Sequence, residues 1–251
     1  MNAWRAVVLA ASTFCLAPLS MAAELQIIAG GGIAAPLKEI AAQFEKTTGH
    51  KLVIRYGTTP ELIKMATTGG PFDLGVVPID VFRNDAARAT FIAPAPSEVA
   101  RVGIGVAVRA GAPKPDISTP AALKQTLLNA KSIASIPESA TGYLLAGIYE
   151  RLGIAEAMNA RIKPQPTPAA IAQSVASGET ELGVFLTNVL TAPGIDLVGP
   201  FPREVQMEVV YHTSVSARAK EAEAANAFIT YLKSPAAAAV IKSKGMTPSS
   251  L

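Results

Sequence analysis

Four short polar segments, each placed between a predicted strand and a predicted helix, hold the residues that could bind a ligand. They are Gly30-Gly31-Gly32, Thr58-Thr59, Ser139 to Gly142, and Thr187-Asn188. A helix start presents unpaired N–H groups and about half a positive charge, so it can bind an anion without a charged side chain. The predicted ligand-binding residues are Gly31, Gly32, Thr58, Thr59, Ser139, Thr141, Thr187 and Asn188.

Each of these segments also has a purely structural interpretation. Ser and Thr at helix starts are ordinary caps. Three consecutive glycines indicate either a close backbone approach or a positive φ, and a turn without any ligand also fits. The turn does not match the dinucleotide-binding pattern G-x-G-x-x-G, because Ala35 holds the sixth place and Arg55, rather than an acid, ends the next strand. We therefore exclude a dinucleotide site.

The chain offers few residues for catalysis. Its two histidines are His50, expected at a solvated helix end, and His212, and neither has a nucleophile elbow or metal-ligand spacing near it. Asp73 precedes a strand, where a carboxylate is usually structural. Met207 and the aromatic residues fit core positions or strand faces. The sequence therefore predicts that the protein is not an enzyme and has no catalytic residue, bound metal or cofactor.

Short apolar runs alternate with amphipathic stretches, which is typical of βαβ units and a largely parallel sheet. The predicted strands are 25–29, 52–55, 74–77, 101–109, 132–136, 182–186 and 205–211. The predicted helices are 34–49, 59–69, 81–89, 120–129, 142–153, 168–178, 217–232 and 235–242, with a short one opening at Thr187-Asn188.

Two long strands, near 101–109 and 205–213, could carry the chain between two lobes. Length alone permits one domain or two. The predicted fold class is α/β with two lobes joined by crossover strands, each lobe a sheet flanked by helices. Lobe one is then discontinuous, with residues 24–104 and 211–251, and lobe two is residues 105–210.

The N-terminus has the layout of a cleavable secretory signal. Arg5 precedes an apolar run over residues 6–17, and Ser20-Met21-Ala22 supplies the small residues of a cleavage site. The run is shorter than the roughly 20 residues that span a bilayer. Cys15 follows Phe14 and so lacks a lipidation context, which leaves the mature chain without cysteine. We predict a signal peptide at residues 1–23, cleaved near Ala22 or Ala23, and a periplasmic product.

The charge balance excludes a nucleic-acid partner. The chain has 22 Lys and Arg against 19 Asp and Glu, and loss of Arg5 leaves 21 against 19, near +2. No basic run or basic-aromatic stripe appears. After the signal no long apolar segment remains, so a soluble, monomeric protein is expected.

Several segments together resemble the periplasmic molybdate-binding proteins. They begin with Ala29 to Ile33, an amphipathic helix into Phe44, and Tyr56-Gly57-Thr58-Thr59. The further segments are Pro71 to Leu74, Gly142 to Leu152, Glu181 to Val184, and Tyr231 to Ala237. The resemblance covers nearly the whole mature chain. It implies a type II periplasmic-binding-protein fold and partnership with the membrane permease of an ABC importer.

The binding residues of that family carry over unevenly. The resemblance implies a Ser where this chain has Gly32 and a Tyr near Leu186, so two side-chain hydroxyls are lost. Each unmade hydrogen bond to a charge would cost roughly 1–3 kcal/mol. Either other donors compensate or the ligand differs, and Gly32 with Leu186 would leave a roomier, more apolar pocket.

We therefore expect an exported solute-binding protein that closes by hinge motion on a small anion, such as molybdate, tungstate or another oxyanion. A small organic acid or another organic solute is the first alternative. An enzyme on the same fold is a second, and handing the ligand-bound state to a membrane receptor is a third.

Overall fold

The computed structural model of the chain describes residues 22–92 and 96–249. The predicted signal peptide therefore lies almost entirely outside the described residues. In the described part, no helix has the length and apolar character that crossing a membrane requires.

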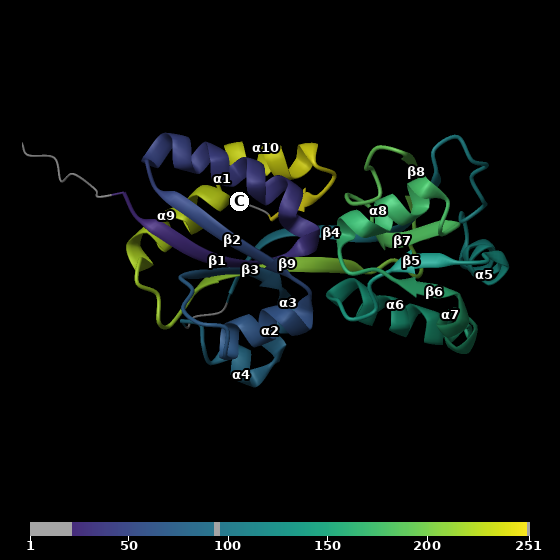
Figure 1. Cartoon of the computed structure of the whole chain (residues 1–251), viewed down its shortest axis with the longest axis horizontal. Coiled ribbons are helices and arrows are strands. Elements are labelled where there is room, and N and C mark those ends of the chain that lie inside the picture. The colour runs from purple at the N-terminus through teal and green to yellow at the C-terminus, as the bar shows by residue number, and fades with distance from the viewer. Residues whose placement is uncertain (1–21, 93–95, 250–251) are drawn as a thin grey trace, which may run out of the picture.

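The strands form one continuous mixed sheet that runs through the whole molecule (Figure 1). Its order is β2-β1-β3-β9-β4-β7-β5-β6, with β8 and β10 also paired to β4. The strands are β1 (Glu24–Gly30), β2 (Lys51–Gly57), β3 (Leu74–Pro78), β4 (Ser97–Arg109), β5 (Ile133–Ser135), β6 (Ile162–Pro164), β7 (Leu182–Leu186), β8 (Ile195–Pro200), β9 (Glu208–Val215) and β10 (Thr247–Pro248).

The strands are parallel within each end of the sheet and antiparallel in its middle. β1 pairs in parallel with β2 and β3, and β5 pairs in parallel with β6 and β7. Between these groups, β9 and β4 run antiparallel to their neighbours. The largely parallel arrangement expected from the βαβ pattern is therefore correct for each end but wrong for the centre, where strands must carry the chain across and back.

Helices cover both faces of the sheet in each lobe (Figure 1). They are η1 (Gly31–Ile33), α1 (Ala34–Thr48), α2 (Thr59–Thr67), α3 (Ile79–Arg83), α4 (Asp85–Arg88), α5 (Pro120–Asn129), α6 (Ala140–Arg151), α7 (Ala155–Arg161), α8 (Pro168–Ser177), α9 (Ala222–Leu232) and α10 (Pro235–Ser243). In lobe one, α1 packs with α9 and α10, where Phe44 meets Phe228 with ring centroids 5.0 Å apart. A separate cluster around Leu62 and Phe72 joins α2, α3 and α4 to the opposite side of β1.

Two long strands join the lobes. β4 is 13 residues long, and its first half pairs with β9 in lobe one while its second half pairs with β7 and β8 in lobe two. The fold is therefore the two-lobed periplasmic-binding-protein type. The boundaries at 104/105 and 210/211 stay a prediction.

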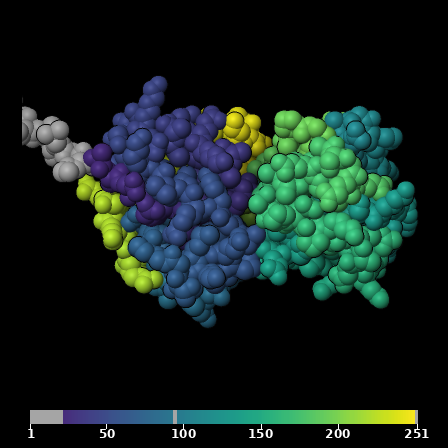
Figure 2. Space-filling model, viewed as in Figure 1, coloured from purple at the N-terminus to yellow at the C-terminus, as the bar shows by residue number. Residues whose placement is uncertain are grey.

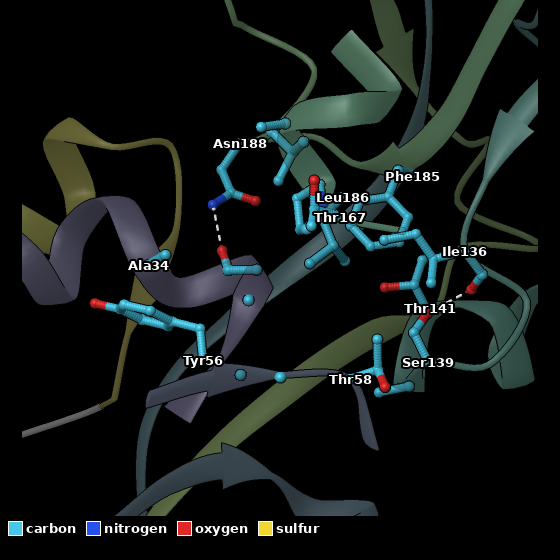
Figure 3. A pocket seen from close by; sticks show the side chains of 18 of the residues that line it. Ala34, Tyr56, Thr58, Ile136, Ser139, Thr141, Thr167, Phe185, Leu186 and Asn188 are labelled. Atoms are coloured by element: carbon cyan, nitrogen blue, oxygen red, sulfur yellow. Dashed lines mark hydrogen bonds between the residues drawn. The ribbon is translucent and has the colours of Figure 1, made fainter. Parts of the chain in front are cut away.

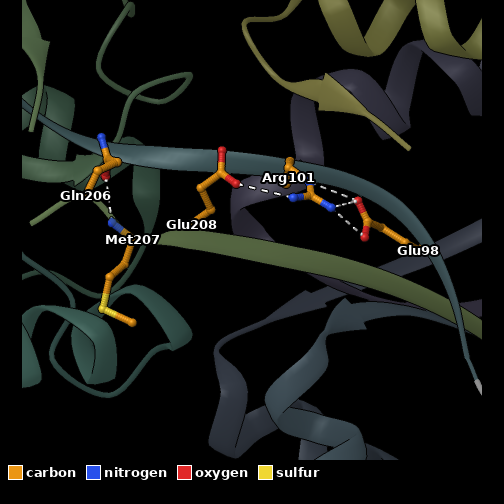
Figure 4. A network of polar contacts seen from close by, with 5 residues as sticks. All are labelled: Glu98, Arg101, Gln206, Met207 and Glu208. Atoms are coloured by element: carbon orange, nitrogen blue, oxygen red, sulfur yellow. Dashed lines mark hydrogen bonds and ion pairs between the residues drawn. The ribbon is translucent and has the colours of Figure 1, made fainter. Parts of the chain in front are cut away.

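A single amide side chain pairs with the backbone at the crossover. Gln206 lies just before β9; its Oε1 accepts from the Ile104 N–H at 2.9 Å and its Nε2 donates to the Ile104 carbonyl at 2.9 Å. The same Oε1 also accepts from the Met207 N–H at 3.0 Å (Figure 4). A Cβ on Gly103 would lie 3.0 Å from Gln206 Nε2, so glycine leaves room for this contact. Beside it, Arg101 binds Glu98 at 2.8 Å. Because β4 joins the two lobes here, a rotation of one lobe relative to the other would have to change the backbone of this segment.

Some element boundaries differ from the predictions. β9 begins three residues later than expected and runs on to Val215, because its alternating inward residues continue beyond Tyr211. α9 starts at Ala222 rather than 217. The segment from Thr187 forms a hydrogen-bonded turn, with Leu190 N–H donating to Leu186 O, and no helix. β6, β8, β10 and α7 were not predicted, since they are short or lack a clear period.

His50 is a further correction. It was expected to be solvated, but it is only 8% exposed and stacks on Phe44 with ring centroids 5.7 Å apart. Its Nδ1 accepts a hydrogen bond from the Ala23 N–H at 3.0 Å, so the imidazole holds the residue that precedes β1.

Candidate functional site

A cavity of about 720 Å³ lies between the lobes and is lined by residues of both. In space-filling view the purple and blue residues of lobe one meet the green residues of lobe two along one boundary (Figure 2). The cavity lies where the glycine turn after β1 and the starts of α2, α6 and α8 come together (Figure 3). Helix starts converge there because they follow the carboxyl ends of parallel strands.

The three glycines are explained by close approaches from other segments. None of them has a positive φ. A Cβ on Gly30 would lie 2.7 Å from Tyr211 Cε1, and one on Gly31 would lie 3.3 Å from Pro168 of lobe two. A Cβ on Gly32 would collide with the Tyr211 hydroxyl and lie 2.5 Å from Leu186 Cδ1. The expectation of a roomier pocket at Gly32 is therefore wrong, because Tyr211 and Leu186 fill that space.

At the start of α2, only one of the two threonine hydroxyls is free. The Thr58 N–H and hydroxyl both donate to Glu61 Oε2, at 2.7 and 3.0 Å. Thr59 is 3% exposed, lines the cavity, and its Oγ1 has no hydrogen-bond partner among the described residues. A buried hydroxyl without a partner costs free energy, which a ligand atom would recover.

The start of α6 shows the same division. Ser139 Oγ donates to Ile136 O at 2.7 Å and accepts from the Gly142 N–H at 3.0 Å, so it acts as a helix cap (Figure 3). Thr141 is 2% exposed and lines the cavity. The Ser139 hydroxyl is used in capping the helix, whereas the Thr141 hydroxyl takes no part in the cap.

Of the last predicted pair, Thr187 lies outside the cavity lining. Its Cγ2 would be 2.9 Å from a Cβ on Gly105, so the side chain points toward β4 and away from the cleft. Asn188 lies on the cavity, and its Nδ2 donates to Gly32 O across the lobes at 2.9 Å (Figure 3). Its Oδ1 is buried without a partner among the described residues.

Four titratable residues of the cavity were not predicted from the sequence. Lys38, Tyr56, Glu61 and Tyr211 all line it. Lys38 Nζ lies 5.7 Å from the centroid of the Tyr56 ring, and burial raises the pKa of Tyr56 to about 12. Lys38 follows the glycine turn by less than two helical turns, a spacing that could have identified it. The sequence around Tyr211 has no comparable spacing to the glycine turn, because Tyr211 is brought to the site only by the pairing of β9 with β3 and β4.

The start of α8 also reaches the cavity and was overlooked. Thr167 and Pro168 were read as a helix start but not as part of the site. Thr167 Oγ1 accepts from the Ala170 N–H at 3.2 Å, as a cap does. Among the residues that the structure describes, no three His, Cys, Asp or Glu side chains gather closely enough to hold a metal ion.

A family model described as bacterial extracellular solute-binding protein matches residues 25–247. The chain belongs to this family. Aconitate isomerase of a Pseudomonas species is 32% identical over 230 residues, covering 89% of this chain and 87% of that protein. The molybdate-binding protein ModA of Azotobacter vinelandii is 29% identical over 246 residues, covering 95% and 96%.

Several solved structures share the fold. The periplasmic molybdate-binding protein of Azotobacter vinelandii superposes with a TM-score of 0.74 at 21% identity, covering 90% of this chain and all of that one. PEB3 of Campylobacter jejuni, solved with L-phospholactate bound, has a TM-score of 0.66 at 14% identity, covering 89% and 99%. Proteins similar to this chain therefore include one named as an isomerase, one named as molybdate-binding and, by fold alone, one solved with L-phospholactate.

We expect the Asn188→Leu variant of this family member to populate an open form more often without ligand. The substitution removes the hydrogen bond to Gly32 O between the lobes, worth about 1 kcal/mol, or roughly a fivefold change in the open-to-closed ratio. Energy transfer between dyes on the two lobes measures it. Asn226→Leu is the control, because its amide bonds only within α9, to Ala222 O at 2.9 Å. Equal efficiencies in both variants would show that this bond does not hold the lobes together.

Proposed function

We propose that this chain is an exported binding protein for a small organic acid with two or three carboxylates, held between the lobes and delivered to the membrane permease of an ABC importer. The observation that carries the proposal is the cavity of about 720 Å³ surrounded by several helix starts. That volume falls in the range of about 300–1,000 Å³ typical of organic-ligand sites. A tetrahedral oxyanion would fill only a small part of it.

The cavity lining combines polar groups from both lobes with apolar side chains. Thr59 at the start of α2 and Thr141 at the start of α6 approach from opposite lobes. Ile136, Phe185 and Leu186 line the same cavity and supply an apolar wall. Donors from both lobes together with an apolar wall fit an anion that has a carbon skeleton.

Helix starts would supply much of the positive charge for an anion here, because the formal charges of the lining side chains cancel. Lys38 is the basic residue of the cavity lining and Glu61 the acidic one. One lysine can bind one carboxylate directly, while helix starts supply partial positive charge for the others. The PEB3 structure carries L-phospholactate, a small organic anion, on the same fold.

The test is a titration calorimetry panel on protein freed of ligand by unfolding and refolding. The panel contains propane-1,2,3-tricarboxylate, cis- and trans-aconitate, citrate, succinate, molybdate, tungstate and sulfate. We expect a di- or tricarboxylate to bind with micromolar or lower Kd and, at 100 times Kd, to add about 2.7 kcal/mol of stability. If only molybdate or tungstate binds, the protein is an oxyanion-binding protein and the proposal of an organic acid is wrong.

The site supports a second candidate function, isomerisation of an unsaturated polycarboxylate. The similarity to aconitate isomerase favours it, and Lys38, Glu61, Tyr56 and Tyr211 in the lining can carry protons. Such a reaction removes a proton from a carbon next to the double bond and adds one to the far carbon of that double bond, so that the double bond shifts by one position. It therefore needs acid-base groups and no redox partner.

Proton NMR in D₂O separates binding from isomerisation. With cis-aconitate as the probe, an isomerase produces the trans isomer with deuterium in the allylic position, whereas a binding protein leaves the spectrum unchanged. No conversion at high protein concentration would support the sequence-based prediction that the chain is not an enzyme.

A further inference from the structure

Tyr211 occupies an unusual position for a strand residue. It lies on β9 in the central sheet, with Pro78 of β3 and Ala100 of β4 as its pairing neighbours, yet its side chain lines the interlobe cavity. The ring lies against the glycine turn, close to Gly30, and the hydroxyl reaches Gly32. The side chain is only 2% exposed.

The hydroxyl of Tyr211 is available to a ligand. No side-chain hydrogen bond among the described residues uses it, and Tyr211 lines the cavity. Burial raises the pKa of Tyr211 above its ordinary value, so the phenol keeps its proton at neutral pH and acts as a donor.

The same hydroxyl takes up the space of a side chain at position 32. A Cβ there would meet Tyr211 Oη first and Leu186 Cδ1 second, at 2.5 Å. Any residue larger than glycine at position 32 would therefore displace the phenol. A donor from β9 and a side chain from the turn after β1 are mutually exclusive here.

We infer that the Tyr211 hydroxyl is a ligand donor that replaces a hydroxyl side chain at position 32 and selects for a carboxylate at this end of the cavity. The inference rests on the proposed function. The phenol lies in the cavity lining near Leu186, and one neutral donor in such a setting suits one carboxylate oxygen. The Gly31 and Gly32 backbone lies beside it for the second oxygen.

The first experiment compares Tyr211→Phe with Tyr231→Phe, using propane-1,2,3-tricarboxylate in titration calorimetry. Tyr231 is the matched control, because its hydroxyl bonds Gln43 Oε1 at 3.3 Å outside the cavity lining. We expect Tyr211→Phe to raise Kd about 10- to 100-fold and Tyr231→Phe to change it less than twofold. If wild-type protein binds the probe and Tyr211→Phe binds equally well, the inference fails. If wild-type protein binds no polycarboxylate, the proposed function fails instead.

The second experiment needs no ligand. Gly32→Ser should lower Tm, because its Cβ collides with the phenol oxygen, and adding Tyr211→Phe should restore part of that loss. The two changes in Tm are then non-additive, as expected for residues that share one space. Additive changes would show that Gly32 and Tyr211 do not exclude one another, and would overturn the structural basis of the inference.

Discussion

Asp73→Ala is expected to lower the free energy of unfolding by about 4 kcal/mol. Asp73 is 4% exposed, and its carboxylate accepts three backbone hydrogen bonds. Oδ2 accepts from the Gln26 N–H at 2.8 Å, and Oδ1 accepts from the N–H groups of Lys220 and Glu221 at 2.7 and 3.1 Å. Truncation leaves three backbone donors unsatisfied, each of which costs about 1–3 kcal/mol when buried.

The size of this effect follows from what Asp73 connects. It joins the beginning of β3 to β1 and to the segment before α9, more than 140 residues away. Urea unfolding measures the loss. Asp85→Ala is the control, because Asp85 makes an exposed ion pair with Arg88 and should change stability by less than about 0.5 kcal/mol. If both variants unfold at the same urea concentration, Asp73 does not hold lobe one together.

Thr59→Val is expected to change ligand affinity and stability in opposite directions. The Thr59 hydroxyl is buried without a partner in the described structure, so its removal should stabilise the unliganded protein by about 1 kcal/mol. If the same hydroxyl donates to a carboxylate, its removal should raise Kd about 10- to 100-fold, since a hydrogen bond to a charged group is worth about 1.5–3 kcal/mol. Thermal unfolding and calorimetry with propane-1,2,3-tricarboxylate measure the two effects.

A second buried threonine supplies the comparison. Thr180 is 1% exposed and its Oγ1 donates to Ser174 Oγ at 3.1 Å, outside the lining of the interlobe cavity. Thr180→Val should therefore destabilise the protein and leave Kd unchanged. A Thr59→Val variant that loses stability and keeps its affinity would remove Thr59 from the site.

Much of the fold was predictable because hydrophobic period and helix caps are local. The start of α2 at Thr58-Thr59-Pro60 and the strands β1 and β3 are examples, each encoded within a few residues. β9 was placed three residues early, because its end depends on pairing with β3 and β4 rather than on its own sequence. The short strands β6 and β8 have too few residues to show a period.

The site was predictable where it consists of helix starts and unpredictable where it depends on tertiary contacts. The sequence could indicate that Thr58 and Ser139 lie at helix starts, but not that capping already occupies both hydroxyls. Thr187 and Asn188 are adjacent, yet only Asn188 faces the cleft. Tyr211 follows Gly32 by 179 positions (211 minus 32), and only the pairing of β9 within the sheet brings the two residues together.

The position of β9 inside the sheet bears on the order in which the chain can fold. β3 and β4 lie on either side of β9, so they lack their shared partner until residues 208–215 are available. The strands of lobe two pair with β4 or with one another at sequence separations of at most 95 residues (Gly105 with Pro200), whereas β3 and β9 pair at up to 141 residues (Leu74 with Val215). Contacts that are distant in sequence form slowly, because loop closure costs entropy before pairing repays it. During refolding, pulse-labelled amides of β5 and β7 should therefore gain protection before those of β3, and the interlobe cavity should be completed last.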